Sequence, residues 1–283
     1  MKQKIGHKIL HIIKKMASIF SKQHVTVSAA SLSYFITLTV FPMLICASAI
    51  LGSLNISQER FLSGLGEIIP LQAVSVVADF LGYVGTNPSP LMIVFGVVVM
   101  ITSSSAAFRS ILRIMGDIQG VSRFKGFVNA VVSFAMSIAF LLAMYISALV
   151  IISGEWLLQI LETNLGFGHI FGLWSWFRFV ILFILLFFVI YSVYFISAPK
   201  ETKRTHRLPG ALLAAVFLVV VSMVFSKMVS ESLKYAIVYG SLASFIIMMV
   251  WLYACGIILI MGNVFNISLH SLRDGQEIPK EEG

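Results

Sequence analysis

The sequence predicts an all-α polytopic membrane protein with six transmembrane helices and further amphipathic helices at the membrane interface. Of its 283 residues, 59% are hydrophobic and 11% are charged, so a single globular core could not bury the apolar surface. The last apolar stretch, 239–269, lies in a segment that has no charge between Lys234 and Arg273. As a helix it would be about 45 Å long, more than the roughly 30 Å hydrocarbon layer of a bilayer. We therefore expect this stretch to cross the membrane at a tilt.

The chain divides into a cytoplasmic basic amphipathic segment (1–24), a six-helix transmembrane domain (25–270) and a cytoplasmic tail (271–283). Cys46 and Cys255 both fall in apolar stretches, which predicts buried packing residues rather than a disulfide or a thiolate metal site. The expected spans are 29–54, 90–112, 126–153, 173–198, 209–230 and 239–269.

Lysines and isoleucines alternate through the N-terminal segment so that, at helical spacing, the apolar residues form one stripe. This pattern is typical of a basic amphipathic helix on an anionic cytoplasmic leaflet. A positive flank that only fixes the orientation of the first span explains the lysines equally well. His7 and His11 are four residues apart, but no acidic residue lies nearby, so we expect no metal site there.

Residues 55–89 are too polar for a span and too apolar for a plain loop. Their apolar side chains recur on one helical face, which predicts one or two amphipathic helices over the outer end of the bundle. Such helices could act as a lid or lateral gate, or form a passive cover. The residues on this face are Val74, Val77, Leu81 and Val84.

The first span holds a group of hydroxyl residues, Ser33, Tyr34 and Thr37, followed by Pro42. Ser33 and Thr37 are one helical turn apart, so this group could face the interior of the bundle as part of a substrate path. Ordinary packing between helices is the alternative, because serine and threonine also serve close helix contacts. Pro42 removes a backbone hydrogen bond and is expected to act as a hinge.

Arg109 and Arg113 lie four residues apart at the end of the second span. The planar guanidinium holds phosphate or carboxylate well, so the pair could bind an anionic head group. The alternative is that both side chains extend to the membrane edge, with Arg113 paired to Asp117 one turn later.

The distribution of basic residues predicts the orientation. The N-terminal segment, the loops 109–125 and 200–207 and the C-terminal tail hold sixteen of the twenty lysines and arginines. By the positive-inside rule both termini are then cytoplasmic. This distribution also explains the net charge of +8 without nucleic acid as a partner.

The sequence lacks the residues that several kinds of enzyme and transporter require. There is no GxxxxGK[ST] phosphate loop, no acidic residue deep in any expected span, and no cluster of carboxylates and histidines for a two-metal nuclease. All six histidines lie at or near span ends, so no serine has a base partner there. We expect neither an enzyme nor a cofactor or metal.

Particular residues resemble the YihY/BrkB family of bacterial inner-membrane proteins. They are Ala29-Ala30-Ser31-Leu32-Ser33-Tyr34 with Phe41-Pro42, Phe108-Arg109 to Arg113, Pro209-Gly210-Ala211, Tyr239-Gly240-Ser241-Leu242-Ala243, Trp251-Leu252-Tyr253 and Gly262-Asn263 to Asn266. The resemblance covers nearly the whole chain, but Asn263 stands where the family more often has alanine. It implies a six-helix protein of the bacterial cytoplasmic membrane. Members carry the older label ribonuclease BN and are associated with serum resistance and envelope lipids, and no catalytic residue is carried over.

These observations together predict a transporter or flippase-like protein that handles an anionic lipid or a related envelope molecule. The alternative is a scaffold or partner subunit of an envelope complex, and a membrane-bound ribonuclease ranks last. Membrane lipids of the anionic inner leaflet are the expected partners, and a homo-oligomer or an envelope protein partner stays open. The residues expected to line or gate a path are Ser33, Tyr34, Thr37, Arg109, Arg113, Tyr239, Trp251 and Asn266.

Overall fold

The computed structural model describes residues 2–53, 57–66, 71–86, 90–120, 124, 126–165, 170–199, 207–230 and 242–273, and all regular structure in these ranges is helical. Six of the helices are long and apolar enough to cross a membrane: α2, α5, α6, α7, α8 and α10. The all-α fold with six spans is therefore confirmed. The described helices are α1 (Lys2–Lys22), α2 (Val25–Ser53), α3 (Gln58–Gly66), α4 (Leu71–Thr86), α5 (Pro90–Gln119), α6 (Gly126–Leu165), α7 (Ile170–Ser197), α8 (Leu208–Ser230) and α10 (Leu242–Arg273).

The helices extend beyond the stretches that the sequence assigned to the membrane. The clearest difference is α6, which continues to Leu165, whereas the sequence placed an outer loop from Gly154. Loss of hydropathy marks the edge of the lipid, but backbone hydrogen bonds continue in water wherever no helix breaker intervenes. Helix α2 runs through Pro42 to Ser53, one residue short of the predicted end of the first span. A hinge at Pro42 stays a prediction.

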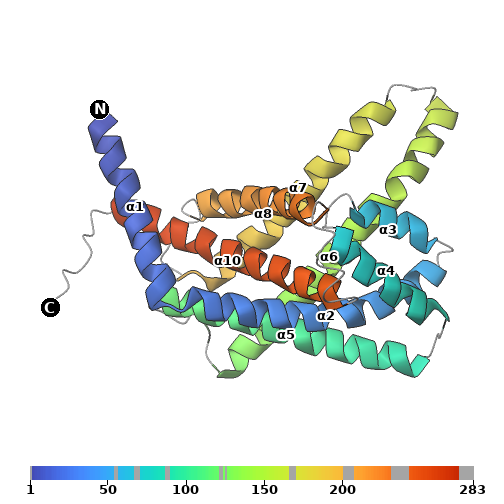
Figure 1. Cartoon of the computed structure of the whole chain (residues 1–283), viewed down its shortest axis with the longest axis horizontal. Coiled ribbons are helices and arrows are strands. Elements are labelled where there is room, and N and C mark those ends of the chain that lie inside the picture. The colour runs from blue at the N-terminus through green and yellow to red at the C-terminus, as the bar shows by residue number, and fades with distance from the viewer. Residues whose placement is uncertain are drawn as a thin grey trace.

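Helix α1 meets α2 at a tight elbow. The chain turns at His24, whose φ of 48° lies in the left-handed region. Beyond this elbow α1 runs crosswise to α2, α5, α8 and α10, which lie roughly along one direction (Figure 1). We call the end of the bundle that carries α1 and the last turns of α10 the α1 end, and the opposite end, which carries α3 and α4, the α4 end.

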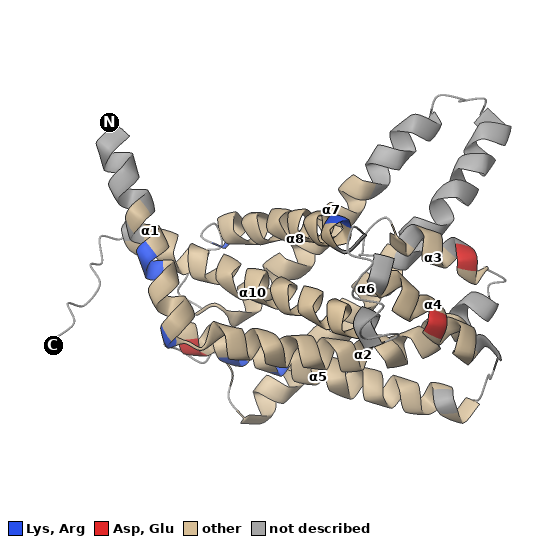
Figure 2. Ribbon diagram, in the orientation of Figure 1, with Lys and Arg blue, Asp and Glu red and all other residues tan. Residues whose placement is uncertain are grey.

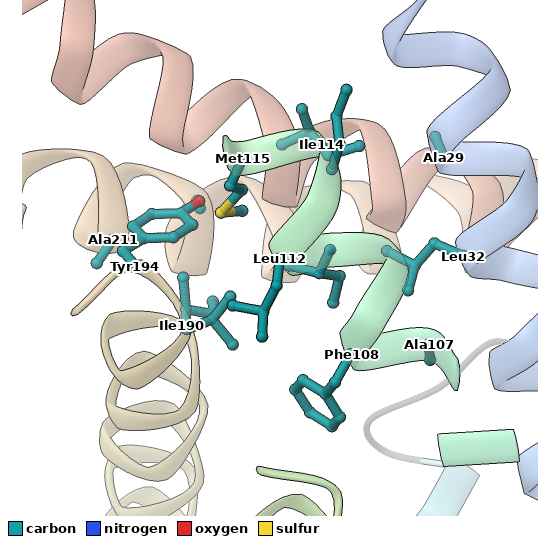
Figure 3. Close-up of a cluster of buried hydrophobic side chains, with 14 of the residues drawn as sticks. Ala29, Leu32, Ala107, Phe108, Leu112, Ile114, Met115, Ile190, Tyr194 and Ala211 are labelled. Carbon is teal, nitrogen blue, oxygen red and sulfur yellow. The ribbon is translucent and has the colours of Figure 1, made fainter. Parts of the chain in front are cut away.

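The main core lies in the half of the bundle nearer the α1 end, where α2, α5, α7, α8 and α10 contribute fully buried side chains. Small residues dominate several contacts: Ala29, Ala211 and Ala214 have no exposed surface. Small side chains let helices approach closely. In a bilayer the hydrophobic effect does not drive helices together, so close van der Waals packing of this kind stabilises the bundle. Figure 3 shows part of this core, with Met115 of α5 beside Tyr194 of α7 and Ala211 of α8.

Two helices, α3 and α4, lie between the first two spans, where the sequence predicted one or two amphipathic helices. Of the four residues on the predicted apolar face of α4, Val77, Leu81 and Val84 are buried and Val74 is half-buried. The ring of Phe41 on α2 forms an edge contact with Phe80 of α4 at 5.1 Å between centroids. It also stacks on Phe245 of α10 at 6.1 Å. Helix α4 is thus packed between α2 and α10.

Charge is distributed unevenly along the bundle. Figure 2 shows that most of the described lysines and arginines gather toward the α1 end. The acidic residues of α3 and α4, Glu59 and Asp79, lie at the other end and are exposed. This uneven distribution agrees with the distribution of basic residues from which the orientation in the membrane was predicted.

Candidate functional site

The most complete polar arrangement in the described chain joins α7, α8 and α10. Asn266 of α10 accepts a hydrogen bond from the backbone N–H of Gly210 through Oδ1 at 2.7 Å. Its Nδ2 donates to the carbonyl of Arg207 at 2.9 Å. Gly210 lies in the first turn of α8, where backbone N–H groups have no partner within the helix. Asn266 therefore caps α8 from another helix.

Two glycines let α8 and α10 meet backbone to backbone. A Cβ on Gly210 would overlap the carbonyl of Gly262 and would lie 2.5 Å from Nδ2 of Asn266. A Cβ on Gly262 would overlap the Tyr194 hydroxyl and would lie 2.8 Å from the Cβ of Ala214. Neither position has room for a side chain, which gives a physical reason for the Pro-Gly-Ala and Gly-Asn motifs at these places.

Tyr194 and Arg207 complete the join. The hydroxyl of the fully buried Tyr194 donates to the carbonyl of Leu259 at 2.5 Å, which ties α7 to α10. The guanidinium of Arg207, only 5% exposed, donates to the carbonyls of Phe195 at 3.4 Å and Pro199 at 3.3 Å. The carbonyl of Phe195 lies in the last turn of α7 and that of Pro199 two residues after the helix ends. Carbonyls without a partner at the end of a helix favour a cation. We call Tyr194, Arg207, Gly210, Gly262 and Asn266 the three-helix clamp.

The sequence indicated only part of this clamp. It singled out Gly210, Gly262 and Asn266 through the family resemblance, but it assigned Arg207 to a basic loop. Burial of an arginine against main-chain carbonyls leaves no pattern in a sequence. The one available signal is the position of Arg207 directly before Leu208-Pro209-Gly210, where a helix begins.

The hydroxyl groups of Ser33 and Thr37 in the first span form hydrogen bonds within their own helix. Ser33 donates to the carbonyl of Ala30 at 2.9 Å, and Thr37 donates to that of Ser33 at 2.8 Å; both side chains are buried. Tyr34 is 53% exposed, so it points away from the helix contacts. Hydrogen bonds to carbonyls of the same helix satisfy these hydroxyl donors, so the side chains can pack closely against other helices.

Arg109 and Arg113 differ in their surroundings. Arg109 is half-buried and donates from Nη1 to the hydroxyl of Ser105 at 3.0 Å, whereas Arg113 is exposed. Side chains of a helix lean toward its N-terminus. The N-terminus of α5 lies at the α4 end (Figure 1), so the Arg109 guanidinium reaches further into the span. It does not extend toward the nearer membrane edge at the α1 end.

The remaining predicted residues lie apart from these. The indole N–H of Trp251 donates to the hydroxyl of Ser222 at 3.2 Å, joining α10 to α8. Trp251 also packs on the cluster that Ala73 of α4 forms with Met248 and Leu252 of α10. It is roughly 22 Å along α10 from Asn266. Tyr239 lies outside the described residues. The structure therefore does not bring all the predicted residues together, and their role in lining a path stays a prediction.

A bundle of six apolar spans, with a crosswise basic helix at one end and an amphipathic pair at the other, defines an integral membrane protein. The chain belongs to the family described as Virulence factor BrkB, whose model matches residues 16–282. This match confirms the family resemblance of the sequence.

Named relatives of similar length agree with this membership. The chain is 25% identical to the ribonuclease-like protein YfkH of Bacillus subtilis, over 92% of this chain and 96% of that protein. It is 24% identical to a UPF0761 membrane protein of Aliivibrio fischeri, over 95% of this chain and 87% of the relative. No solved structure matches.

The term ribonuclease in the name of the first relative describes that protein, and no catalytic activity follows from it for this chain. Within the part of the chain that the structure describes, no group of three or more His, Cys, Asp or Glu residues could hold a metal ion.

Proposed function

We propose that this integral membrane protein moves an anionic lipid or a related envelope molecule, as a transporter or flippase-like protein. Its place would be the bacterial cytoplasmic membrane, with both termini in the cytoplasm. The uneven distribution of lysines and arginines supports this orientation. The relatives that carry membrane-protein names support the membrane location.

The observation that carries the proposal is Arg109. It lies within the candidate span Ile93–Gln119, about 15 Å along the helix from Gln119. A charged side chain at the centre of a bilayer costs about 2.5 to 3.5 kcal/mol on insertion scales, and such residues mark substrate or ion pathways. Its partner among the described residues is a neutral hydroxyl, that of Ser105.

The guanidinium of Arg109 suits an anionic head group in chemistry and geometry. A guanidinium has five N–H donors in a planar fork, and two parallel donors match the oxygens of a phosphate or carboxylate. Arg113 follows one turn later on the same helix and is exposed, nearer the α1 end. A phosphate that left Arg113 for Arg109 would move deeper into the span while it kept a cationic partner.

Translocation in liposomes tests this proposal. Purified protein would be reconstituted with a fluorescent anionic phospholipid, and transfer between leaflets would be followed by a membrane-impermeant quencher. We expect Arg109→Gln to slow transfer at least tenfold. Lys227→Gln, which removes one exposed positive charge near the end of α8, should keep the original rate. Equal rates for the unmodified protein and Arg109→Gln would contradict the assigned role of Arg109.

A second candidate function, a scaffold or partner subunit of an envelope complex, is favoured by the packing of α2. The buried hydroxyls of Ser33 and Thr37 bond to carbonyls of their own helix and offer nothing to a passing head group. A folded, reconstituted protein that moved lipid no faster than empty liposomes would support the scaffold and exclude the transporter.

A further inference from the structure

Helix α1 has a wider apolar surface than the bundle covers. Met16, Ile19 and Phe20 pack against the main core. Leu10 and Ile13, in contrast, are 49% and 57% exposed. At 100° per residue, Leu10 and Ile13 lie within about 60° of each other around the helix, beside the packed side. Ala17, also exposed, falls between them. We call Leu10, Ile13 and Ala17 the apolar flank.

Lysines follow the apolar flank around the helix: Lys14 lies next to Leu10, whereas Lys22 and Lys15 lie further round, with Lys15 about 40° from the packed Ile19. Lys14, Lys15 and Lys22 fall within an arc of about 100° around the helix axis. The order around α1 is thus the packed side, the apolar flank and the lysine arc. An apolar strip with lysines along one edge is the pattern of a helix in the interface between acyl chains and head groups.

The orientation of α1 fits a helix that lies at the membrane surface. Helices that span a bilayer lie roughly along its normal. The candidate spans α2, α5, α8 and α10 share one rough direction, and α1 runs crosswise to them at their end (Figure 1). A helix crosswise to the spans is parallel to the membrane plane. Its uncovered flank then meets the leaflet that surrounds the bundle at the α1 end.

We propose that α1 is a membrane-surface helix that selects anionic phospholipid through its lysine arc and inserts its apolar flank into the same leaflet. Charge complementarity favours this occupant. The sequence of α1 itself contains lysines but no aspartate or glutamate, so the charged side chains of this helix are all positive. Anionic phospholipid offers negative charge and apolar chains side by side, as the two neighbouring surfaces of α1 require. The inference does not depend on lipid transport.

Fluorescence quenching of the full chain in nanodiscs tests the placement of the flank. Ile13→Cys would carry a fluorophore in a mixture of zwitterionic and anionic phospholipid, with bromine on the acyl chains of one lipid at a time. The parent chain, whose Cys46 is buried and Cys255 half-buried, sets the labelling background. We expect strong quenching at position 13. Ser18→Cys, at an exposed position between the lysines, should be quenched at least threefold less.

The lipid that carries the bromine tests charge selection. Quenching at position 13 should be several-fold stronger with brominated anionic lipid than with brominated zwitterionic lipid. A lysine near an anionic surface contributes about fivefold in binding, so Lys14→Gln should lower this ratio by about that factor. Lys227→Gln should leave it unchanged.

Three results would overturn the inference. An unquenched label at position 13 would mean that solvent, a second copy or a protein partner meets the flank. Equal quenching by both brominated lipids would remove the selection of anionic lipid. An unchanged ratio in Lys14→Gln would remove the role of the lysine arc.

Discussion

The side-chain amide of Asn266 satisfies two backbone groups that belong to the start of another helix. In lipid no water replaces such bonds, and an unsatisfied buried group costs about 1 to 3 kcal/mol. We therefore expect Asn266→Ala to lower the free energy of unfolding by about 2 kcal/mol, seen as a lower melting temperature in detergent.

Asn263 provides the matched control on the same helix. It is 3% exposed, and its Nδ2 has no hydrogen-bond partner among the described residues. Asn263→Ala should therefore cost clearly less than Asn266→Ala. Equal losses from the two substitutions would contradict the capping role of Asn266. The control also tests the position at which this chain departs from the family pattern.

Gly262 has no space for a methyl group, because Tyr194, Ala214 and the carbonyl of Gly210 surround it. Overpacking of this kind costs about 1 to 3 kcal/mol. We expect Gly262→Ala to lower the melting temperature. Gly82→Ala, on α4 where a Cβ would meet nothing within 4 Å, should be neutral or slightly stabilising. A harmless Gly262→Ala would show that α8 and α10 do not touch there.

At the scale of elements, the aromatic contacts of Phe41 hold α4 between α2 and α10. Phe41 is half-buried, so its truncation should cost less than the roughly 3 to 5 kcal/mol of a fully buried phenylalanine. Because Phe41 lies at the contact between α4 and the spans, its loss should release α4 first. Phe41→Ala should therefore speed hydrogen exchange in α4 more than in α7, measured by mass spectrometry.

Tyr83→Ala, on the exposed side of α4 with Tyr83 64% exposed, is the control for this change. It should leave exchange in α4 near that of the unmodified chain. If Phe41→Ala also left α4 protected, the helix would be held by other contacts, and a passive cover would describe it better than a gate.

For the whole molecule, the sequence predicted the number of spans because a long uncharged apolar stretch has one low-energy location, the bilayer. It did not predict where helices end, since α6 continues to Leu165 on backbone hydrogen bonds that hydropathy does not report. It also missed the burial of Arg207, whose partners are carbonyls in the last turn of α7 and just after it. Main-chain acceptors are present in every sequence, so only the fold reveals which ones meet a given arginine.

The orientation of the molecule is the last prediction, because the assignment of α1 to a cytoplasmic leaflet depends on it. Two exposed carboxylates at opposite ends of the bundle provide a matched pair for cysteine labelling: Asp117 at the end of α5 and Asp79 on α4. If the positive-inside rule holds, an impermeant maleimide should label Asp79→Cys in intact cells. Asp117→Cys should react only after the membrane is opened.

The reverse labelling pattern would place the lysines of α1 outside the cell. The cytoplasmic leaflet would then no longer be the leaflet that meets Leu10 and Ile13. The quenching experiment in nanodiscs would keep its meaning, since both leaflets there have the same composition. The two measurements thus separate which membrane surface α1 meets from whether α1 binds that surface at all.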